Sequence, residues 1–157
     1  DSAGGNLVAA LGIYNREFLK RNIIYQILIY PVTIFSSNFP SKIKYDGIIL
    51  SAKLMNWFEE KYLPRKDRIK YLNDWRLSPA KAGNLKNLPK TLLILAECDP
   101  LFDEGKYFAS ELKKNNNEVE LIIYKGQIHG FITMGGIISD ANHMIDLVKE
   151  RANSLLD

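Results

Sequence analysis

Residues 91–105 read TLLILAECDPLFDEG, and this stretch decides the fold. It begins with an apolar run over Thr91 to Glu97, which is typical of a strand, and Asp99-Pro100 ends that run. The pattern then predicts a helix over about 103–114 and another strand over 119–124. A strand, a helix of about a dozen residues and a second strand form a βαβ unit, so the sequence indicates an α/β fold with a parallel sheet.

The same alternation extends toward both ends of the chain. Apolar residues spaced by three or four predict a helix over about Gly5 to Lys20. The nearly continuous apolar run of Ile23 to Tyr30, closed by Pro31, suits a strand buried on both faces of a parallel sheet. Residues 33–46 are polar and rich in turn formers. Beyond them we expect a helix from about Ser51, its N-cap, to Pro64, a short helical or irregular segment over 65–79, a loop over 125–131 and a final helix over 139–155.

Composition excludes several classes of function. Nearly half of the 157 residues are hydrophobic and a quarter are charged, as in an ordinary globular domain, and the net charge of +3 is spread over scattered lysines, so we expect no nucleic-acid partner. The longest apolar runs, residues 22–32 and 91–96, are too short to span a bilayer. Cys98 is the only cysteine, which excludes an intrachain disulfide and fits a reducing, cytoplasmic location. No metal-ligand spacing or phosphate-binding glycine loop is present, so no cofactor is expected.

Three polar residues stand at places where a parallel sheet presents its functional loops. Asp1-Ser2-Ala3-Gly4 supplies the last four residues of a G-x-S-x-G nucleophile elbow, although Ser2 is equally well explained as a helix N-cap. Asp99 directly follows a strand, where it could also cap the next helix. His129 follows the last strand, and a single loop histidine is most often only a polar surface residue.

Taken together, these residues point to catalysis. They occur in the order Ser2, Asp99, His129, which is the chain order of the triad in α/β-hydrolases. Each follows a strand, if one precedes Asp1. Three independent structural explanations would have to coincide for the catalytic interpretation to be wrong.

The chain resembles the hormone-sensitive-lipase-like branch of the α/β-hydrolases, which includes carboxylesterases, acetyl esterases and arylacetamide deacetylase-like enzymes. The resemblance covers nearly all 157 residues and rests on residues 1–7 (DSAGGNL), Tyr30-Pro31, Ser78-Pro79, Leu88-Pro89, residues 99–105 (DPLFDEG) and His129-Gly130-Phe131.

This resemblance implies a catalytic triad and an incomplete fold. Ser2 would be the nucleophile, Asp99 the acid and His129 the base, with the backbone N–H of Ala3 as one oxyanion donor. The family's other donors come from an upstream H-G-G-G-type loop, which this sequence does not contain. We therefore expect residues 1–157 to be the C-terminal portion of a single α/β-hydrolase domain that needs the N-terminal half of the fold for activity.

The resemblance also places a cap-contributing helical insertion at about 33–77. Trp57, Phe58 and Tyr62 would line the substrate pocket there, although packing in the helix core explains them equally simply. Asp103 and Glu104 are expected in the first turn of a helix, where the helix dipole favours negative charge. We expect His143 at a surface or helix contact and Cys98 as a buried structural thiol.

The implied activity is hydrolysis of short to medium acyl esters through an acyl-enzyme, with a small-molecule ester as substrate. Two alternatives remain open: a non-catalytic small-ligand-binding member of the same fold, and an amidase or peptidase. His129 argues for an enzyme, because hormone receptors of this branch have lost that histidine. The sequence leaves a homodimer open.

Overall fold

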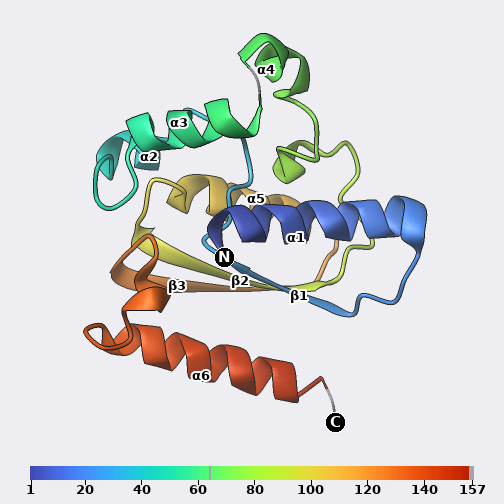
Figure 1. Cartoon of the computed structure of the whole chain (residues 1–157). Coiled ribbons are helices and arrows are strands. Elements are labelled where there is room, and N and C mark those ends of the chain that lie inside the picture. Colours follow the sequence, from blue (N-terminus) through green and yellow to red (C-terminus); the bar gives the residue numbers. More distant parts are fainter. Residues whose placement is uncertain (64, 156–157) are drawn as a thin grey trace.

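The computed structural model describes residues 1–63 and 65–155. Over this part of the chain three parallel strands pair in the order β1 (Tyr25–Ile29), β2 (Lys90–Cys98) and β3 (Val119–Ile128). Helices α1 (Ser2–Tyr14) and α5 (Phe102–Lys114) cover one face of the sheet, and α6 (Ser139–Asn153) covers the other (Figure 1). The predicted α/β class is confirmed.

The central strand β2 explains why residues 91–105 decide the fold. Leu93 and Leu95 pack with Phe108 of α5 on one face, while Leu92 and Ile94 belong to the core beneath α6 on the other face. A strand buried on both faces cannot alternate apolar with polar residues, so its sequence is continuously apolar. The strand is therefore the rigid centre from which the neighbouring loops are placed.

Helix α1 begins earlier than predicted, at Ser2, and ends in a π-helical turn, η1 (Asn15–Leu19). Its first turn lies very close to the chain that follows β1. A Cβ added to Gly5 would lie 2.8 Å from the Cβ of Pro31, a distance at which the chain would have to shift. Glycine is therefore required for α1 to approach the end of β1 this closely.

The segment between β1 and β2 contains the helices α2 (Pro40–Lys44), α3 (Ala52–Tyr62) and α4 (Arg65–Tyr71) and a 3₁₀ turn, η2 (Pro79–Lys81). Helix α2 was not predicted. The Ser51 hydroxyl accepts a hydrogen bond from the N–H of Leu54 at 3.1 Å, which confirms the N-cap. Pro64, the predicted end of this helix, lies outside the described residues. Helix α3 lies beyond α1 and α5, away from the sheet, and buries none of its residues (Figure 1).

Strand β3 is longer than predicted because a bulge lies inside it. Tyr124 pairs with Ala96 and Ile128 pairs with Cys98, so three residues, 125–127, stand opposite Glu97 alone. The Glu97 carboxylate accepts a hydrogen bond from the N–H of Gly126 at 2.9 Å, and this bond is the main reason why the pKa of Glu97 is lowered. Bulges redirect a strand, and this one directs the chain into residue 129. The residues expected to form a loop from Lys125 are therefore partly strand.

Two smaller differences concern the ends of β2 and α6. Cys98 is half-buried rather than buried, because it lies where the pairing of β2 with β3 shifts. Helix α6 ends at Asn153, two residues before the predicted end.

Among residues 1–63 and 65–155, no helix combines the length and apolar character needed to cross a bilayer.

Candidate active site

Ser2 stands at the start of α1 with a backbone φ of +49°, in the left-handed region that non-glycine residues rarely adopt. The residues around it hold this geometry in place. The Ser2 carbonyl accepts a hydrogen bond from the N–H of Val32 at 3.3 Å. The buried side chain of Asn6 donates to the carbonyls of Val32 at 2.9 Å and Leu77 at 2.8 Å. Strain of this kind persists where neighbouring contacts fix it, often at functional sites.

Asp99 is fully buried just past the end of β2. One carboxylate oxygen accepts a hydrogen bond from the N–H of Leu101 at 2.9 Å, at the start of α5. The other oxygen lies 2.7 Å from Nδ1 of His129. Asp99 can therefore cap the helix and act as the acid of a triad at the same time, because a different carboxylate oxygen makes each contact.

His129 connects the other two residues. Its Nε2 lies 3.0 Å from Oγ of Ser2. When Nδ1 donates its proton to Asp99, Nε2 is left as the acceptor for the serine hydroxyl. The structure thus brings Ser2, His129 and Asp99 into one hydrogen-bonded line, although 127 residues separate the first two.

The ring of Tyr30 packs against the imidazole of His129, and the sequence alone did not identify it as a site residue. It is fully buried, its backbone φ is +33°, and its ring centroid lies 4.6 Å from that of the His129 imidazole. Burial raises the pKa of Tyr30 to about 12, and the negative charge of Asp99 acts in the same direction. Its signal in the sequence is the Tyr30-Pro31 pair, one of the motifs that carry the family resemblance.

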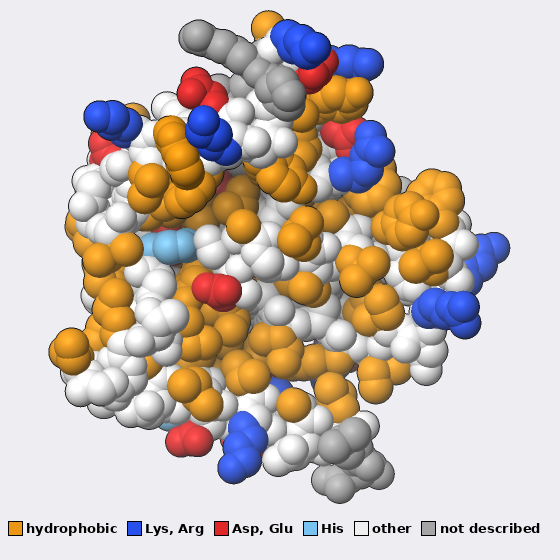
Figure 2. Space-filling view, viewed as in Figure 1, with side chains coloured by type: hydrophobic (Ala, Val, Ile, Leu, Met, Phe, Trp, Pro, Cys, Tyr) orange, Lys and Arg blue, Asp and Glu red, His pale blue; other side chains and the backbone are white. Residues whose placement is uncertain are grey.

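The Ser2 and His129 side chains border a cavity of about 820 Å³. In Figure 2, hydrophobic side chains surround a hollow beside α3, with a histidine at its edge. Phe58 and Tyr62 line the cavity, whereas Trp57 is not among the lining residues and packs edge-on against Phe58. The other apolar residues of the wall are Leu7, Val32, Phe35, Ile49, Leu50, Leu54, Met55 and Leu101.

Ala3 also lines the cavity, next to Ser2 in the first turn of α1. The first N–H groups of a helix have no acceptor within the helix. The N–H of Ala3 is therefore available to an atom that enters the cavity. The positive end of the helix dipole favours negative charge at this position.

The remaining candidate residues lie elsewhere. Asp103 and Glu104 are in the first turn of α5, as predicted, but Glu104 is completely buried and accepts specific hydrogen bonds, so the helix dipole alone does not account for it. The Nδ1 atom of His143 lies 3.2 Å from the Tyr124 hydroxyl, a contact between α6 and β3. Within the described ranges, no three His, Cys, Asp or Glu residues are grouped so that they could hold a metal ion.

Known proteins with similar sequences and structures define the family. The model of a family described as alpha/beta hydrolase fold matches residues 1–133. The chain belongs to this family, and its motifs place it in the hormone-sensitive-lipase-like branch, where its relatives are esterases.

Two curated relatives and one solved structure illustrate the similarity. An ethyl acetate hydrolase of Pseudomonas putida is 35% identical over 155 residues, which cover 96% of this chain and 47% of the relative. The carboxylic ester hydrolase LipN of Mycobacterium tuberculosis is 32% identical over 158 positions, covering 95% of this chain and 42% of LipN. An esterase of Pyrobaculum calidifontis matches with a TM-score of 0.91 and 36% identity, over 99% of this chain and 51% of that structure. The chain spans about half the length of the curated relatives it matches.

Proposed function

We propose that the whole protein is a serine carboxylic-ester hydrolase that acts through an acyl-enzyme on short to medium acyl esters. The observation that carries the proposal is the line of hydrogen bonds from Ser2 through His129 to Asp99, at the edge of a largely apolar cavity. The printed names of the relatives, an ethyl acetate hydrolase and a carboxylic ester hydrolase, support ester hydrolysis.

In the acylation step, Oγ of Ser2 attacks the ester carbonyl carbon while Nε2 of His129 takes the hydroxyl proton. A tetrahedral oxyanion results, and the N–H of Ala3 would donate to it; removal of one such donor typically costs about 10²–10³ in rate. The imidazolium then gives its proton to the leaving alkoxide as the carbon–oxygen bond breaks. Asp99 keeps the imidazole in the correct tautomer and stabilises its positive charge.

Deacylation repeats these steps with water. Nε2 of His129 takes a proton from a water molecule, whose oxygen attacks the acyl carbon. The second tetrahedral species collapses, the bond from Ser2 Oγ to the acyl carbon breaks, and the imidazolium returns a proton to Oγ. The products are the alcohol and the carboxylic acid, and the site regains its starting state.

The proposal extends to the whole protein, of which residues 1–157 would be the C-terminal portion of one catalytic domain. Among the described residues, β1 pairs only with β2, so its other edge is free to bind another strand. Next to that edge, Leu11, Tyr14 and Phe18 are exposed, and hydrophobic side chains gather along α1 in Figure 2. Further strands packed there would supply the remaining oxyanion donors, and residues 33–77 would contribute to a cap.

We further propose a cytoplasmic location for this enzyme. Cys98 is the only cysteine of the sequence, so residues 1–157 form no disulfide among themselves, as is usual in a reducing compartment. Fractionation of the source cells, with immunodetection of the protein, tests this location directly.

A fluorophosphonate probe tests the nucleophile, because it forms a covalent bond with an activated serine. We expect the whole protein to be labelled at Ser2, and labelling to disappear in Ser2→Ala but persist in Ser154→Ala, which changes an exposed serine in the turn after α6. Hydrolysis of a matched ester and amide pair then distinguishes an esterase from an amidase. A folded whole protein without labelling would identify a ligand-binding protein instead.

A further inference from the structure

Glu104 is a fully buried carboxylate that the proposed reaction does not use. We propose that it is a positioning residue: it holds one wall of the substrate cavity and thereby sets the preference for acyl-chain length. This inference rests on the proposed ester hydrolysis and deepens it, because it concerns which esters the cavity accepts.

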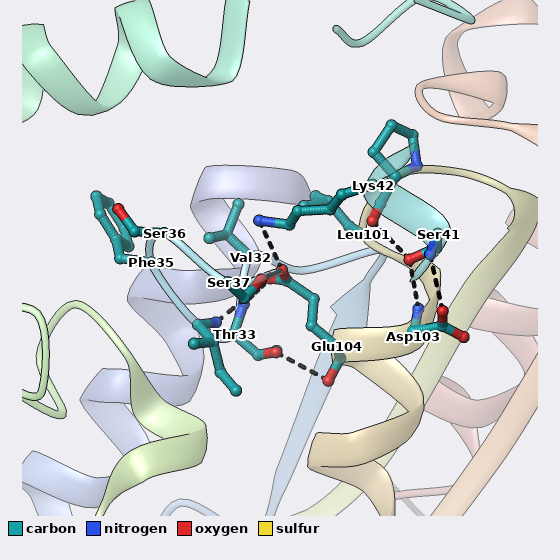
Figure 3. A network of polar contacts seen from close by, with 12 residues as sticks. Val32, Thr33, Phe35, Ser36, Ser37, Ser41, Lys42, Leu101, Asp103 and Glu104 are labelled. Atoms are coloured by element: carbon teal, nitrogen blue, oxygen red, sulfur yellow. Dashed lines mark hydrogen bonds and ion pairs between the residues drawn. The ribbon is translucent and has the colours of Figure 1, made fainter. Parts of the chain in front are cut away.

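Four groups from the segment after β1 converge on the Glu104 carboxylate (Figure 3). Oε1 accepts hydrogen bonds from the N–H groups of Thr33 at 2.8 Å and Ile34 at 3.3 Å. Oε2 accepts one from the Ser37 hydroxyl at 2.8 Å and lies 3.0 Å from the ammonium group of Lys42. The carboxylate is therefore fully paired, as a buried charge must be.

The segment held in this way forms part of the cavity wall. Val32 and Phe35 both line the cavity. The Phe35 ring lies 6.0 Å from the ring of Tyr62, and Ser36 donates from its N–H and its hydroxyl to the carboxylate of Glu59, at 3.1 and 2.8 Å. Both partners are on α3, so the position of the segment also determines where α3 lies.

Glu104 can fix this position because its own helix is rigidly placed. A Cβ added to the next residue, Gly105, would lie 2.5 Å from a methyl group of Leu95, so α5 is pressed against β2. The same helix start is bonded to Asp99. Glu104 therefore links the segment after β1, and with it α3, to the buried sheet that carries the proposed triad.

The segment after β1 is also held by bonds from Asn6 to Val32 and from Phe35 to Ser78, but the α3 part of the wall has little hydrophobic packing. No residue of α3 is buried, so hydrophobic packing contributes little to its position. A charged group that accepts several hydrogen bonds is a stronger and more directional link than a surface contact. Lys42 itself lines the cavity, and its pairing with Glu104 balances its charge beside the apolar wall.

The test measures kcat and KM of the whole protein for p-nitrophenyl acetate, butyrate and hexanoate. Glu104→Gln preserves the shape of the side chain but removes the negative charge that pairs with Lys42. We expect kcat/KM for the hexanoate to fall roughly tenfold more than for the acetate, the size of effect that a methylene-scale change in a pocket produces. The additional loss should appear in KM, because the reacting groups stay in place.

Glu111→Gln is the matched control, because it makes the same chemical change on α5 at a residue whose side chain bonds to Lys114 at 2.7 Å and does not line the cavity. It should leave the preference for chain length unchanged. Ser37→Ala removes one of the four donors and keeps the charge pair, so it provides a milder variant that should shift the preference in the same direction even if Glu104→Gln fails to fold.

The outcomes separate this inference from the proposed function. If the wild-type protein hydrolyses none of the three esters, the proposed function is wrong and the inference falls with it. If the wild-type protein is active but the variants lose activity by one factor for all three esters, or lose none, only the role of Glu104 is overturned.

Discussion

The ends of the strands and the wall of the cavity are built in different ways. Asp99 and His129 follow β2 and β3 directly, and β2 is buried on both faces. The opposite wall comes from the segment between β1 and β2, where α3 buries no residue and is held by contacts such as that of Ser36 with Glu59. The chemistry is thus placed by packing and the cavity wall by a few polar contacts.

This difference indicates how the two regions should respond to mutation. If the residues at the strand ends act as one catalytic unit, as proposed, loss of any member should affect every substrate alike. Residues of the wall contact only part of a substrate, so their loss should change the preference among substrates. Each of the following experiments tests one side of this comparison.

The largest effect is expected for His129→Ala. This change removes the group that would take the Ser2 proton, and loss of the corresponding histidine in a serine protease lowers kcat by about 10⁶. We expect a loss of this order for every ester, measured as kcat of the whole protein. If kcat of the variant stays within about a hundredfold of the wild-type value, instead of falling by about 10⁶, another residue is the base.

Asp99→Asn should have the next largest effect. An asparagine at this position would favour the wrong tautomer of His129, which in a well-studied triad lowers kcat by about 10⁴. The loss should again be equal for short and long esters, as measured by kcat across the acyl series. Retention of most activity would move the acid elsewhere, with Asp103 as the first residue to test.

Adjacent residues of α3 provide a direct test of the wall. Phe58 lines the cavity and Trp57 does not, although both are about half exposed. Phe58→Ala should change the ratio of kcat/KM between hexanoate and acetate esters by about tenfold, within the range for altered pocket contacts. Trp57→Ala should leave that ratio unchanged. An equal effect of both substitutions would show that α3 acts through its stability and not through contact with the substrate.

The fold could be read from the sequence more completely than the wall. Strands such as β2 are visible because burial on both faces demands a continuous apolar run, and two of the proposed triad residues, Asp99 and His129, directly follow strands. Helix α2 and the bulge in β3 were missed, because each depends on a tertiary contact: Ser41 of α2 donates to the Asp103 carboxylate at 2.9 Å, and Glu97 binds the bulge. From the sequence, Glu104 is explained as an acidic residue that the helix dipole favours. Its hydrogen-bond partners Thr33 and Ile34 lie about 70 residues earlier in the chain, so no local pattern reveals them.

The packing beneath Ser2 can be tested at two neighbouring glycines. Gly5→Ala should destabilise the protein by about 1–3 kcal/mol, the usual cost of overpacking, because the added methyl group would meet Pro31. Gly4→Ala is the control, since a Cβ there would meet nothing within 4 Å. Urea denaturation of the whole protein measures both changes. Equal stability of the two variants would show that α1 shifts away from Pro31 at little cost.

The smallest expected effect concerns the ionisation of Tyr30 behind His129. Its pKa is raised to about 12, chiefly by burial, whereas a tyrosine in the unfolded chain has a pKa of about 10. Below pH 10 the phenol is neutral in both states, and the stabilisation is fully present. Between about pH 10 and pH 12 the unfolded chain ionises while the folded protein resists, so the free energy of unfolding falls as the pH rises.

Tyr30→Phe keeps the ring against His129 and removes this titration. The free energy of unfolding of the wild-type protein should therefore fall between pH 9 and pH 11 by about 1 kcal/mol more than that of the variant. Tyr25 and Tyr124 also have raised pKa values, so only the difference between the two proteins isolates Tyr30. Tyr107→Phe makes the same chemical change at an exposed ring and serves as the matched control for the substitution itself. An equal pH response of Tyr30→Phe and the wild type would show that water reaches the phenol, and that the support behind His129 is less rigid than the strand ends.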